Sequence, residues 1–541
     1  MLVTLNHVLA LSAAVLGVSG LGTPEQRWGS SHTGRTVRPN PIRNTIHERA
    51  SGEKRFLNAN STKFALDGKK IPDVDFDIGE AYAGNLPISS DPNDPQSLYF
   101  WFQPSTNPKA DKEIVIWLNG GPGCSSLEGF LQENGPFLWQ WGTYKPVPNP
   151  WAWSQLTNMV WVDQPVTTGF STGNATAHDE FDVAKQFLGF YKNLVDTFAL
   201  QGYKVYVTGE SYAGLYCPYI SSAMVDAKDE TYYNIKGMMI YDPVIAGRDL
   251  SGDVVAAPIA DQHSNLFSLN QTFVKYLHDK DQECGYADLR KKYLTFPPPG
   301  NLPRIKPGPG CDEIDSNFYD AIVAINPCFN PYEVSTTCPM LWDVLGYPGR
   351  LPYTPDGANV YFDRADVKKA INAPPNKSWS ECGGKPFVGS DERRIPPSII
   401  HVLPNVIDHT KNVIIGSGSL DYVVPTLNTI LGIQNMTWGG KLGFQKKPVE
   451  PLFVPYHQDG ALATLAGAGV MGTTHEERGL TFAVVGLSGH MVPQFAPTAA
   501  YRQLEKLLGR VCSLSSRKPF TTDSSNTPQP KGDLGQGTVV F

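Results

Sequence analysis

Residues Gly209–Gly214 read Gly-Glu-Ser-Tyr-Ala-Gly, and Ser211 at their centre is the first candidate for covalent chemistry. Small residues two positions before and after a serine allow the sharp turn of a nucleophile elbow, which holds the hydroxyl above a sheet. Gly209 and Ala213 fill those positions, so the pattern is G-x-S-x-A. The pattern predicts a serine that can attack a carbonyl carbon, with an ordinary small-residue turn as the alternative.

A glycine-rich segment is the second feature that could take part in such a reaction. Residues Trp117–Ser126 read W-L-N-G-G-P-G-C-S-S and follow the apolar run Ile114–Ile116, which is typical of a buried strand. Without Cβ atoms, the loop could bring backbone N–H groups close to a carbonyl oxygen. If the serine elbow were absent, an ordinary Gly/Pro turn would be the better interpretation.

An aspartate and a histidine further along the chain could complete the chemistry. Asp421 follows the strand pattern Val413–Gly418, and His490 follows the strand pattern Leu480–Val485. Taken singly, the aspartate is typical of a turn or cap and the histidine of a loop. Together they give the chain order serine, acid, histidine that α/β-hydrolases use, at the strand ends where open α/β sheets place their sites.

These segments resemble the serine carboxypeptidase family over about residues 65–510. The resemblance implies an α/β-hydrolase fold, with a central mostly parallel sheet and an inserted, mainly helical cap subdomain. It rests on motifs that occur in the family's order and at family-like spacing: Trp117–Ser126, Glu133–Phe137, Asn149–Trp153, Val162–Pro165, Gly209–Pro218 and Gly489–Pro493.

The resemblance also assigns roles to individual residues. Ser211 would be the nucleophile, His490 the general base and then acid, and Asp421 the residue that orients the histidine. The oxyanion hole would be formed by the backbone N–H groups of Gly121 and Tyr212. Tyr241-Asp242-Pro243 departs from the family's common G-N-G, and Thr167-Thr168 stands in a stretch that often contains glycine.

Substrate recognition is implied in the same way. Asn119, Glu133 and Glu210, with Gly120 of the glycine loop, would hold the free carboxylate of a peptide C-terminus. Two glutamates at close range cannot both ionise, so they would share protons and bind a carboxylate at acidic pH. We therefore expect release of C-terminal amino acids from peptides or proteins through an acyl-enzyme intermediate.

Two other functions stay open at this stage. An acyltransferase or esterase could use the same scaffold, with an alcohol or amine in place of water. Retention of Asn119, Glu133 and Glu210 favours the peptidase, because an ester has no free carboxylate to hold. A catalytically silent binding or storage protein is the third possibility, and the intact Ser211, Asp421 and His490 argue against it.

Composition and patterning suggest the organisation of the chain. Its 541 residues are 41% hydrophobic and 18% charged, enough for a large core, and a net charge of -7 argues against a nucleic-acid partner. We expect the following parts: a signal peptide at 1–20, a possible propeptide or disordered arm at 21–55, the first part of the core at 56–247, the insertion at 248–399, the second part of the core at 400–512 and a disordered tail at 513–541.

The N-terminal apolar run Val8–Val18 predicts secretion, with the vacuole as the alternative destination. A buried N-terminal helix would explain the same run. Lys54-Arg55 could be a dibasic processing site. No other apolar stretch approaches the ~20 residues of a membrane span, so we expect none.

Eight cysteines and five N-x-S/T sequons fit an oxidising, glycosylating compartment. The resemblance implies that Cys124 pairs with Cys382. Four cysteines of the insertion would make two bridges of undetermined connectivity, and Cys217 would be a buried free thiol; reduced cysteines throughout are the alternative. The four are Cys284, Cys311, Cys328 and Cys338, and the sequons are at Asn60, Asn174, Asn270, Asn376 and Asn435.

No cofactor or metal site is expected. Gly467–Gly472 fits G-x-G-x-x-G but has no βαβ context, and His475-Glu476 has no second histidine at metalloprotease spacing.

Overall fold

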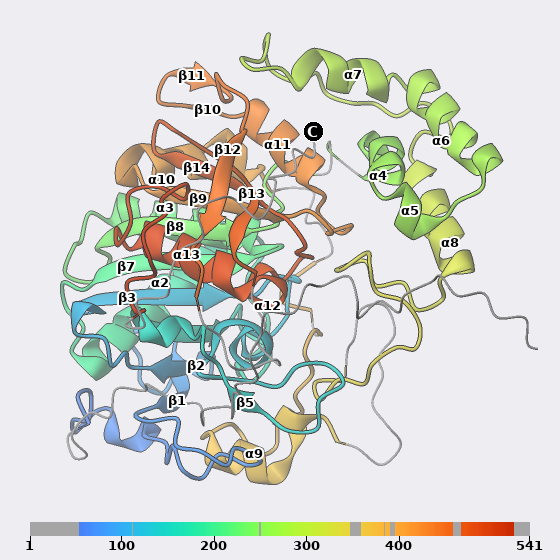
Figure 1. Ribbon diagram of the computed structural model, residues 1–541. Coiled ribbons are helices and arrows are strands. Elements are labelled where there is room, and N and C mark those ends of the chain that lie inside the picture. The colour runs from blue at the N-terminus through green and yellow to red at the C-terminus, as the bar shows by residue number, and fades with distance from the viewer. Residues whose placement is uncertain are drawn as a thin grey trace, which may run out of the picture. The chain divides into compact units, whose positions relative to one another are not determined.

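A large mixed sheet forms the centre of the structure, which is a computed structural model (Figure 1). The structure describes residues 54–523 except residue 111 and the segments 248–249, 251, 347–358, 384, 390–394 and 458–466. The predicted signal peptide and nearly all of the predicted arm therefore lie outside the described residues. Within the described residues, ten strands pair in the order β1-β2-β6-β3-β7-β8-β9-β14-β13-β12.

The middle of this sheet is parallel and its two margins are antiparallel. Strands β6, β3, β7, β8, β9 and β14 run parallel to one another, whereas β1–β2, β2–β6, β12–β13 and β13–β14 pair antiparallel. The predicted mostly parallel α/β-hydrolase sheet is confirmed. In spatial order the strands are β1 (Tyr82–Pro87), β2 (Ser97–Gln103), β6 (Asn158–Asp163), β3 (Glu113–Leu118), β7 (Lys204–Glu210), β8 (Ile235–Tyr241), β9 (Val413–Gly418), β14 (Leu480–Val485), β13 (Gly469–Glu477) and β12 (Glu450–Val454).

Apolar side chains cover both faces of the parallel strands. On β3, Ile114 and Ile116 belong to one hydrophobic cluster, whereas Val115 and Trp117 belong to a second. Successive side chains of a strand point to opposite faces, so a continuous apolar run supplies both clusters. Burial on both faces fixes the position of each strand within the sheet, and hence where the loop that follows the strand begins.

Helices flank the sheet and fill the connections between its strands. The long helices α2 and α3 pack on each other, and α10 packs on α3. The helices are α1 (Leu127–Gly129), α2 (Glu180–Phe198), α3 (Ala213–Ala227), α4 (Ala256–Gln262), α5 (Ser264–Phe267), α6 (Gln271–Glu283), α7 (Tyr286–Tyr293), α8 (Ile314–Ile325), α9 (Ala365–Ala370), α10 (Val402–Thr410), α11 (Thr426–Gln434), α12 (Val492–Phe495) and α13 (Pro497–Leu507). Two short hairpins, β4 (Phe137–Leu138) with β5 (Val147–Pro148) and β10 (Thr437–Trp438) with β11 (Lys441–Leu442), lie outside the large sheet.

Helices α4 to α8 form a separate group beyond the strands, in yellow-green and yellow at the upper right of Figure 1. They have a hydrophobic cluster of their own, which includes Leu277 and Phe318 and reaches Leu431 on α11. Disulfides join Cys284 to Cys311 and Cys328 to Cys338. No strand occurs among the described residues of the predicted insertion, 248–399.

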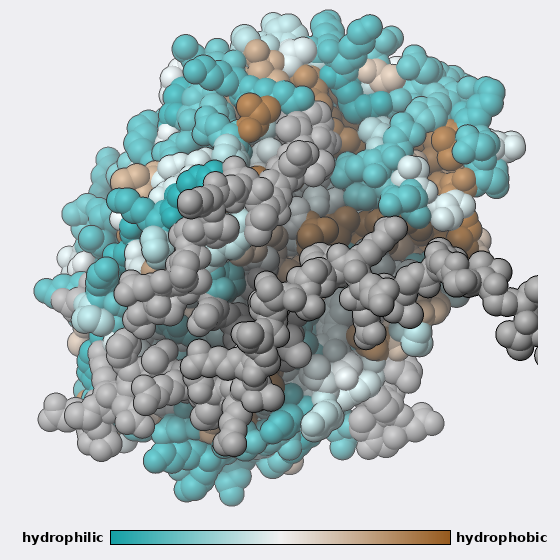
Figure 2. All heavy atoms as spheres, viewed as in Figure 1, coloured by the Kyte–Doolittle hydropathy of each residue, from teal (hydrophilic) through white to brown (hydrophobic). Residues whose placement is uncertain are grey.

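Hydrophilic residues dominate the visible described surface in Figure 2, and hydrophobic residues gather in a band to the right of its centre. The search for membrane-spanning helices, made over the described residues, found none of sufficient length and apolar character.

The structure differs from the predicted disordered tail over residues 513–523. Phe520 is 4% exposed and packs against Trp151 and Tyr501. Buried Arg502 donates to the backbone oxygens of Ser516 and Lys518, both at 2.9 Å. A polar segment therefore folds here because the core offers it backbone hydrogen bonds and one aromatic pocket, which composition alone does not reveal.

Candidate active site

Ser211 lies in the tight turn between β7 and α3. Its φ of 59° is in the left-handed region, which non-glycine residues adopt rarely and usually under constraint from their surroundings. Its N–H donates to Tyr241 O on β8 at 2.9 Å, and its carbonyl accepts from Gly214 N and Val244 N. A Cβ at Gly209 would lie 2.3 Å from Leu118 O, so only glycine fits there. The local geometry is that of a nucleophile elbow.

Asp421 and His490 face each other at the ends of neighbouring strands β9 and β14. His490 Nδ1 and Asp421 Oδ2 are 2.7 Å apart, and both residues are buried. Backbone N–H groups of Val423 and Val424 donate to the same carboxylate at 2.8 and 3.1 Å. These donors hold the aspartate as an acceptor, so Nδ1 carries the proton and Nε2 is left as the acceptor.

Ser211 and His490 both line one cavity of about 120 Å³. Among the described residues, His490 Nε2 is buried and has no hydrogen-bond partner. Catalytic hydrogen bonds are often long before a substrate is bound, so this arrangement suits a base that awaits the serine proton. The same cavity is lined by Asn119, Gly120, Gly121 and Glu210.

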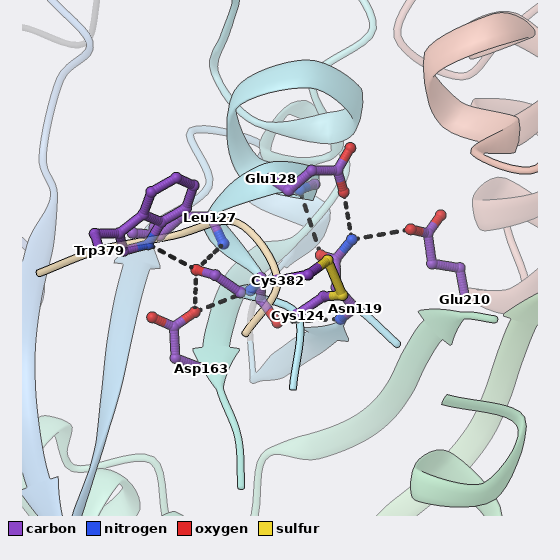
Figure 3. Close-up of a disulfide and its surroundings, with 11 residues drawn as sticks. Asn119, Cys124, Leu127, Glu128, Asp163, Glu210, Trp379 and Cys382 are labelled. Carbon is purple, nitrogen blue, oxygen red and sulfur yellow. Dashed lines mark hydrogen bonds between the residues drawn. A yellow bond between two sulfur atoms is a disulfide. The ribbon is translucent and has the colours of Figure 1, made fainter. Parts of the chain in front are cut away.

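The glycine loop after β3 passes very close to the elbow. A Cβ at Gly120 would lie 2.6 Å from Tyr212 N and 2.7 Å from Ser211 Cβ. A disulfide joins Cys124 of this loop to Cys382, the pairing that the family resemblance implies. The buried carboxylate of Asp163 accepts from Ser125 Oγ at 2.6 Å and from Ser126 N at 2.9 Å (Figure 3). The loop is therefore held from both sides while it contacts the serine.

Asn119 lies at the centre of a buried acidic cluster, and Figure 3 shows its amide pointing between Glu128 and Glu210. Trp117 Nε1 donates to Asn119 Oδ1 at 2.8 Å, and an indole nitrogen can only donate. The amide nitrogen therefore faces the other way, donating to Glu210 Oε1 at 2.9 Å and to Glu128 Oε2. The carboxyl groups of Glu128, Glu133 and Glu210 lie within 4.8 Å of one another.

Burial and mutual repulsion keep protons on these acids. Burial raises the pKa of Glu128 to about 7. Burial, together with the charges of the neighbouring glutamates, raises the pKa of Glu133 and that of Glu210 well above the ordinary value. Carboxylates without protons cannot donate to one another, so protons must be shared for the cluster to be stable. At acidic pH the cluster offers donors as well as acceptors.

Several residues that shape the site were not singled out from the sequence. Glu128 could have been noticed as a charged residue within the apolar stretch Leu127–Leu131. Glu381 lines the cavity, where the disulfide at its neighbour Cys382 and the hydrogen bond from Ser125 N to Glu381 O hold it. Asp242 stands at a departure from the family pattern, to which the sequence assigned no role; one of its carboxyl oxygens lies within 4.8 Å of a carboxyl oxygen of Asp421 and of a ring nitrogen of His490.

Two groups of described side chains come close enough to share a metal ion: Asp242 with Asp421 and His490, and Glu128 with Glu133 and Glu210. In both groups, hydrogen bonds already occupy atoms that could bind a metal ion. His490 Nδ1 pairs with Asp421, and the Asn119 amide donates to Glu128 and Glu210. Their chemistry is that of proton sharing and orientation.

The remaining predicted positions lie away from the cavity. Cys217 on α3 is a buried free thiol, and Cys512 is an exposed one. The sequon asparagines Asn60, Asn174, Asn270 and Asn376 are exposed. Asn435 is half-buried, and its Oδ1 accepts from Leu302 N at 2.8 Å.

Comparison with known proteins finds serine carboxypeptidases by both family and individual relatives. A sequence model of the family described as serine carboxypeptidase matches residues 72–510. The chain is 53% identical over 470 residues to a probable serine carboxypeptidase of Arthroderma benhamiae, covering 85% of this chain and 88% of the relative. It is 48% identical over 474 residues to serine-type carboxypeptidase F of Aspergillus niger, covering 84% and 88%.

One solved structure extends this comparison to the fold. A prohormone-processing carboxypeptidase from Saccharomyces cerevisiae superposes with a TM-score of 0.62 at 22% identity, over 83% of this chain and 96% of that one.

Proposed function

The chain belongs to the serine carboxypeptidase family and acts on peptides, and we propose that Ser211, His490 and Asp421 carry out its reaction. The observation that carries this assignment is the convergence of a strained serine and a buried Asp–His pair on one cavity. Each cycle would release one residue from the C-terminus of a peptide or protein.

The geometry supports a two-step acyl transfer. Ser211 Oγ attacks the scissile carbonyl carbon while His490 Nε2 takes the hydroxyl proton, and Asp421 stabilises the imidazolium that forms. The N–H groups of Gly121 and Tyr212 stabilise the tetrahedral oxyanion. The C–N bond then breaks as His490 returns the proton to the leaving amine, which leaves an ester on Ser211. Water, deprotonated by His490, hydrolyses that ester and regenerates the serine.

The acidic cluster would recognise the terminal carboxylate. Asn119, Gly120, Glu133 and Glu210 lie on or just behind the cavity wall beside Ser211. A substrate carboxylate would be repelled by ionised glutamates, but it can accept hydrogen bonds from the Asn119 amide and from protonated acids. Peptide binding should therefore weaken as rising pH removes these protons.

The first experiment compares a blocked dipeptide that has a free C-terminus with its C-terminal methyl ester at about pH 5, using wild type and Ser211→Ala. Release of the free amino acid by wild type and its loss by at least about 10⁴-fold in the variant would support the proposal. Activity on the ester alone would contradict it and would move the assignment to an esterase or acyltransferase.

The second experiment measures kcat/KM for both substrates between pH 4 and pH 8. We expect the value for the free acid to fall more steeply above about pH 6 than that for the ester, since the ester does not need protonated Glu133 and Glu210. Identical profiles would contradict the role of the cluster.

We also propose that the protein is secreted or vacuolar and carries N-linked glycans. The four exposed sequon asparagines and the three disulfides support this proposal. An enzyme that removes N-linked glycans should lower the mass of protein isolated from its native source, and an unchanged mass would contradict the glycan proposal.

A further inference from the structure

The cavity beside Ser211 contains more carboxyl groups than recognition of a terminal carboxylate requires. Glu128 and Glu381 line it in addition to Glu210. Gln132 and Trp141 form another part of its wall, where Trp141 Nε1 donates to Gln132 Oε1 at 3.0 Å. Behind them, Gln132 Nε2 donates to buried Asp343 at 2.7 Å. The side of the cavity near Glu128 is thus polar and acidic.

Among the described residues, no cationic side chain forms an ion pair with these acids. The cavity lining contains no lysine or arginine among the described residues, and no ion pair within that part of the chain involves Glu128, Glu381 or Asp343. Glu381 Oε2 is buried without a hydrogen-bond partner in the described structure. Burial, with Asp343 and Glu128 nearby, raises the pKa of Glu381 well above its ordinary value. Buried carboxyls left unpaired in this way are costly unless a ligand completes them.

The position of Glu128 shows which part of a substrate would meet these acids. One amide nitrogen, Asn119 Nδ2, donates to both Glu210 and Glu128. If Asn119 and Glu210 hold the terminal carboxylate, as in the proposed function, Glu128 lies immediately beside it. The carbon that bears this carboxylate also bears the side chain of the leaving residue. That side chain must therefore enter the cavity next to Glu128, and Glu381 lines the same cavity.

We propose that this pocket selects peptides that end in lysine or arginine, with Glu128 and Glu381 as the residues that contact the cationic side chain. The inference rests on the proposed function and adds the class of leaving residue. An ammonium or guanidinium group would supply the donors that Glu381 Oε2 lacks, and would form charge-assisted hydrogen bonds in a site shielded from water.

The preference should depend on pH in a characteristic way. The charged or titratable groups around Glu128 are Glu133, Glu210, Asp343, Glu381 and His490. At acidic pH the acids keep protons, and a cationic side chain must displace at least one proton on binding. As pH rises, less work is needed to release that proton, so the ratio of kcat/KM for arginine to that for leucine should rise between about pH 4.5 and pH 6.5. Using the ratio cancels the loss of carboxylate binding that all peptides share.

The test uses the full chain and blocked dipeptides with one penultimate residue and C-terminal Arg, Lys, Leu or Glu. At pH 5 to 6 we expect kcat/KM for Arg and Lys to exceed that for Leu by at least about tenfold. Glu128→Gln and Glu381→Gln should each lower the Arg/Leu ratio of kcat/KM by about tenfold, mainly through KM for Arg. Glu333→Gln is the matched control, because Glu333 is buried and its side chain, within the described part of the chain, bonds to nearby Ser335 and Thr336.

A charge reversal provides a second readout. Glu381→Lys should move the preference toward C-terminal Glu, and labelling of Ser211 by a phosphonate reports the fraction of folded enzyme in each sample. The inference is overturned if Leu is cleaved as well as Arg, or if both glutamine variants leave the ratio unchanged. Failure of the proposed function would look different, as loss of release from all four substrates.

Discussion

At the scale of single residues, the site depends on carboxyl groups whose environments differ sharply. The Asp421 carboxyl accepts from the N–H groups of Val423 and Val424 and pairs with His490 Nδ1. Asp242, close behind it, accepts from Ser417 Oγ at 2.9 Å and from Gly418 N at 2.8 Å. Burial and the charge of Asp421 raise the pKa of Asp242 well above its ordinary value. Asp242 therefore keeps its proton to a higher pH than an ordinary aspartate does.

This assignment predicts the effect of Asp242→Asn on stability. Below about pH 3.9 the carboxyl is protonated in both the folded and the unfolded chain, so its pKa shift has no effect there. As pH rises, the unfolded chain loses this proton first, and the folded state becomes relatively less stable until its own pKa is passed. The asparagine mimics the protonated acid and does not titrate. We expect the variant to be about 1–2 kcal/mol more stable than wild type near pH 7 and nearly equal to it near pH 3.5.

Urea unfolding at the two pH values measures this difference. Asp242→Ala serves as the comparison, because it loses the bonds to Ser417 and Gly418 and should be less stable at both pH values. A gain from asparagine that is the same at both pH values would show that the carboxyl does not hold its proton.

At this scale the sequence predicted positions better than environments. Ser211, Asp421 and His490 could be selected because each follows a strand pattern in the expected order. The role of Glu128 could not be predicted in this way, because it depends on a hydrogen bond from the Asn119 amide. Trp117 on β3 sets the orientation of that amide by donating to Asn119 Oδ1. Such hydrogen bonds follow from three-dimensional packing, which a linear pattern does not record.

At the scale of elements, the glycine loop and the elbow approach each other closely enough to exclude a side chain at Gly120. Gly120→Ala would place its Cβ 2.6 Å from Tyr212 N and 2.7 Å from Ser211 Cβ. One of the two loops must move, which should displace the N–H groups of Gly121 and Tyr212 that we propose to stabilise the oxyanion. We expect kcat to fall by about 10²-fold or more and the folded state to lose about 1–3 kcal/mol.

Active-site titration and thermal unfolding measure the two effects of this change. Gly300→Ala is a suitable control, since a Cβ there meets no atom within 4 Å, and it should leave both quantities nearly unchanged. Wild-type kcat in Gly120→Ala would refute the claim that close approach of these loops is needed for catalysis.

The elements also show where sequence reasoning succeeds. The apolar runs at 114–116, 204–208, 413–418 and 480–485 lie in β3, β7, β9 and β14, adjacent or nearly adjacent strands of one sheet. Apolar patterning gives such strands reliably because both of their faces are buried. The segment 513–523 has no such pattern; it is held by hydrogen bonds from Arg502 and by the pocket for Phe520, and composition misleads there.

At the scale of the whole molecule, buried acids make stability depend on pH. Burial raises the pKa of Glu128 to about 7, and that of Asp163 and Asp343 to about 6 each. The same cause raises the pKa of four other buried carboxyl groups well above the ordinary value, those of Glu133, Glu210, Asp242 and Glu381. Near pH 6 the folded chain therefore holds several protons that the unfolded chain, with carboxyl pKa values of about 4, has released. Folding is then favoured by acid.

We accordingly predict that thermal stability is greatest near pH 4 to 5 and falls steadily toward pH 7.5. Each proton retained only by the folded state lowers the free energy of unfolding by about 1.4 kcal/mol per pH unit. Exposed carboxyls such as Asp366, whose pKa is lowered by its hydrogen bond with Arg364, act in the opposite direction, but surface pairs contribute little.

Calorimetry of Ser211→Ala, which should be free of autolysis, measures how steeply the melting temperature falls with pH. The double change Glu128→Gln and Asp242→Asn should flatten that slope, because two of the retained protons are then replaced by amides. A melting temperature that is constant or rising from pH 5 to pH 7 would mean that the buried acids are ionised in the folded state, and the proton-sharing account of carboxylate recognition would fail with it.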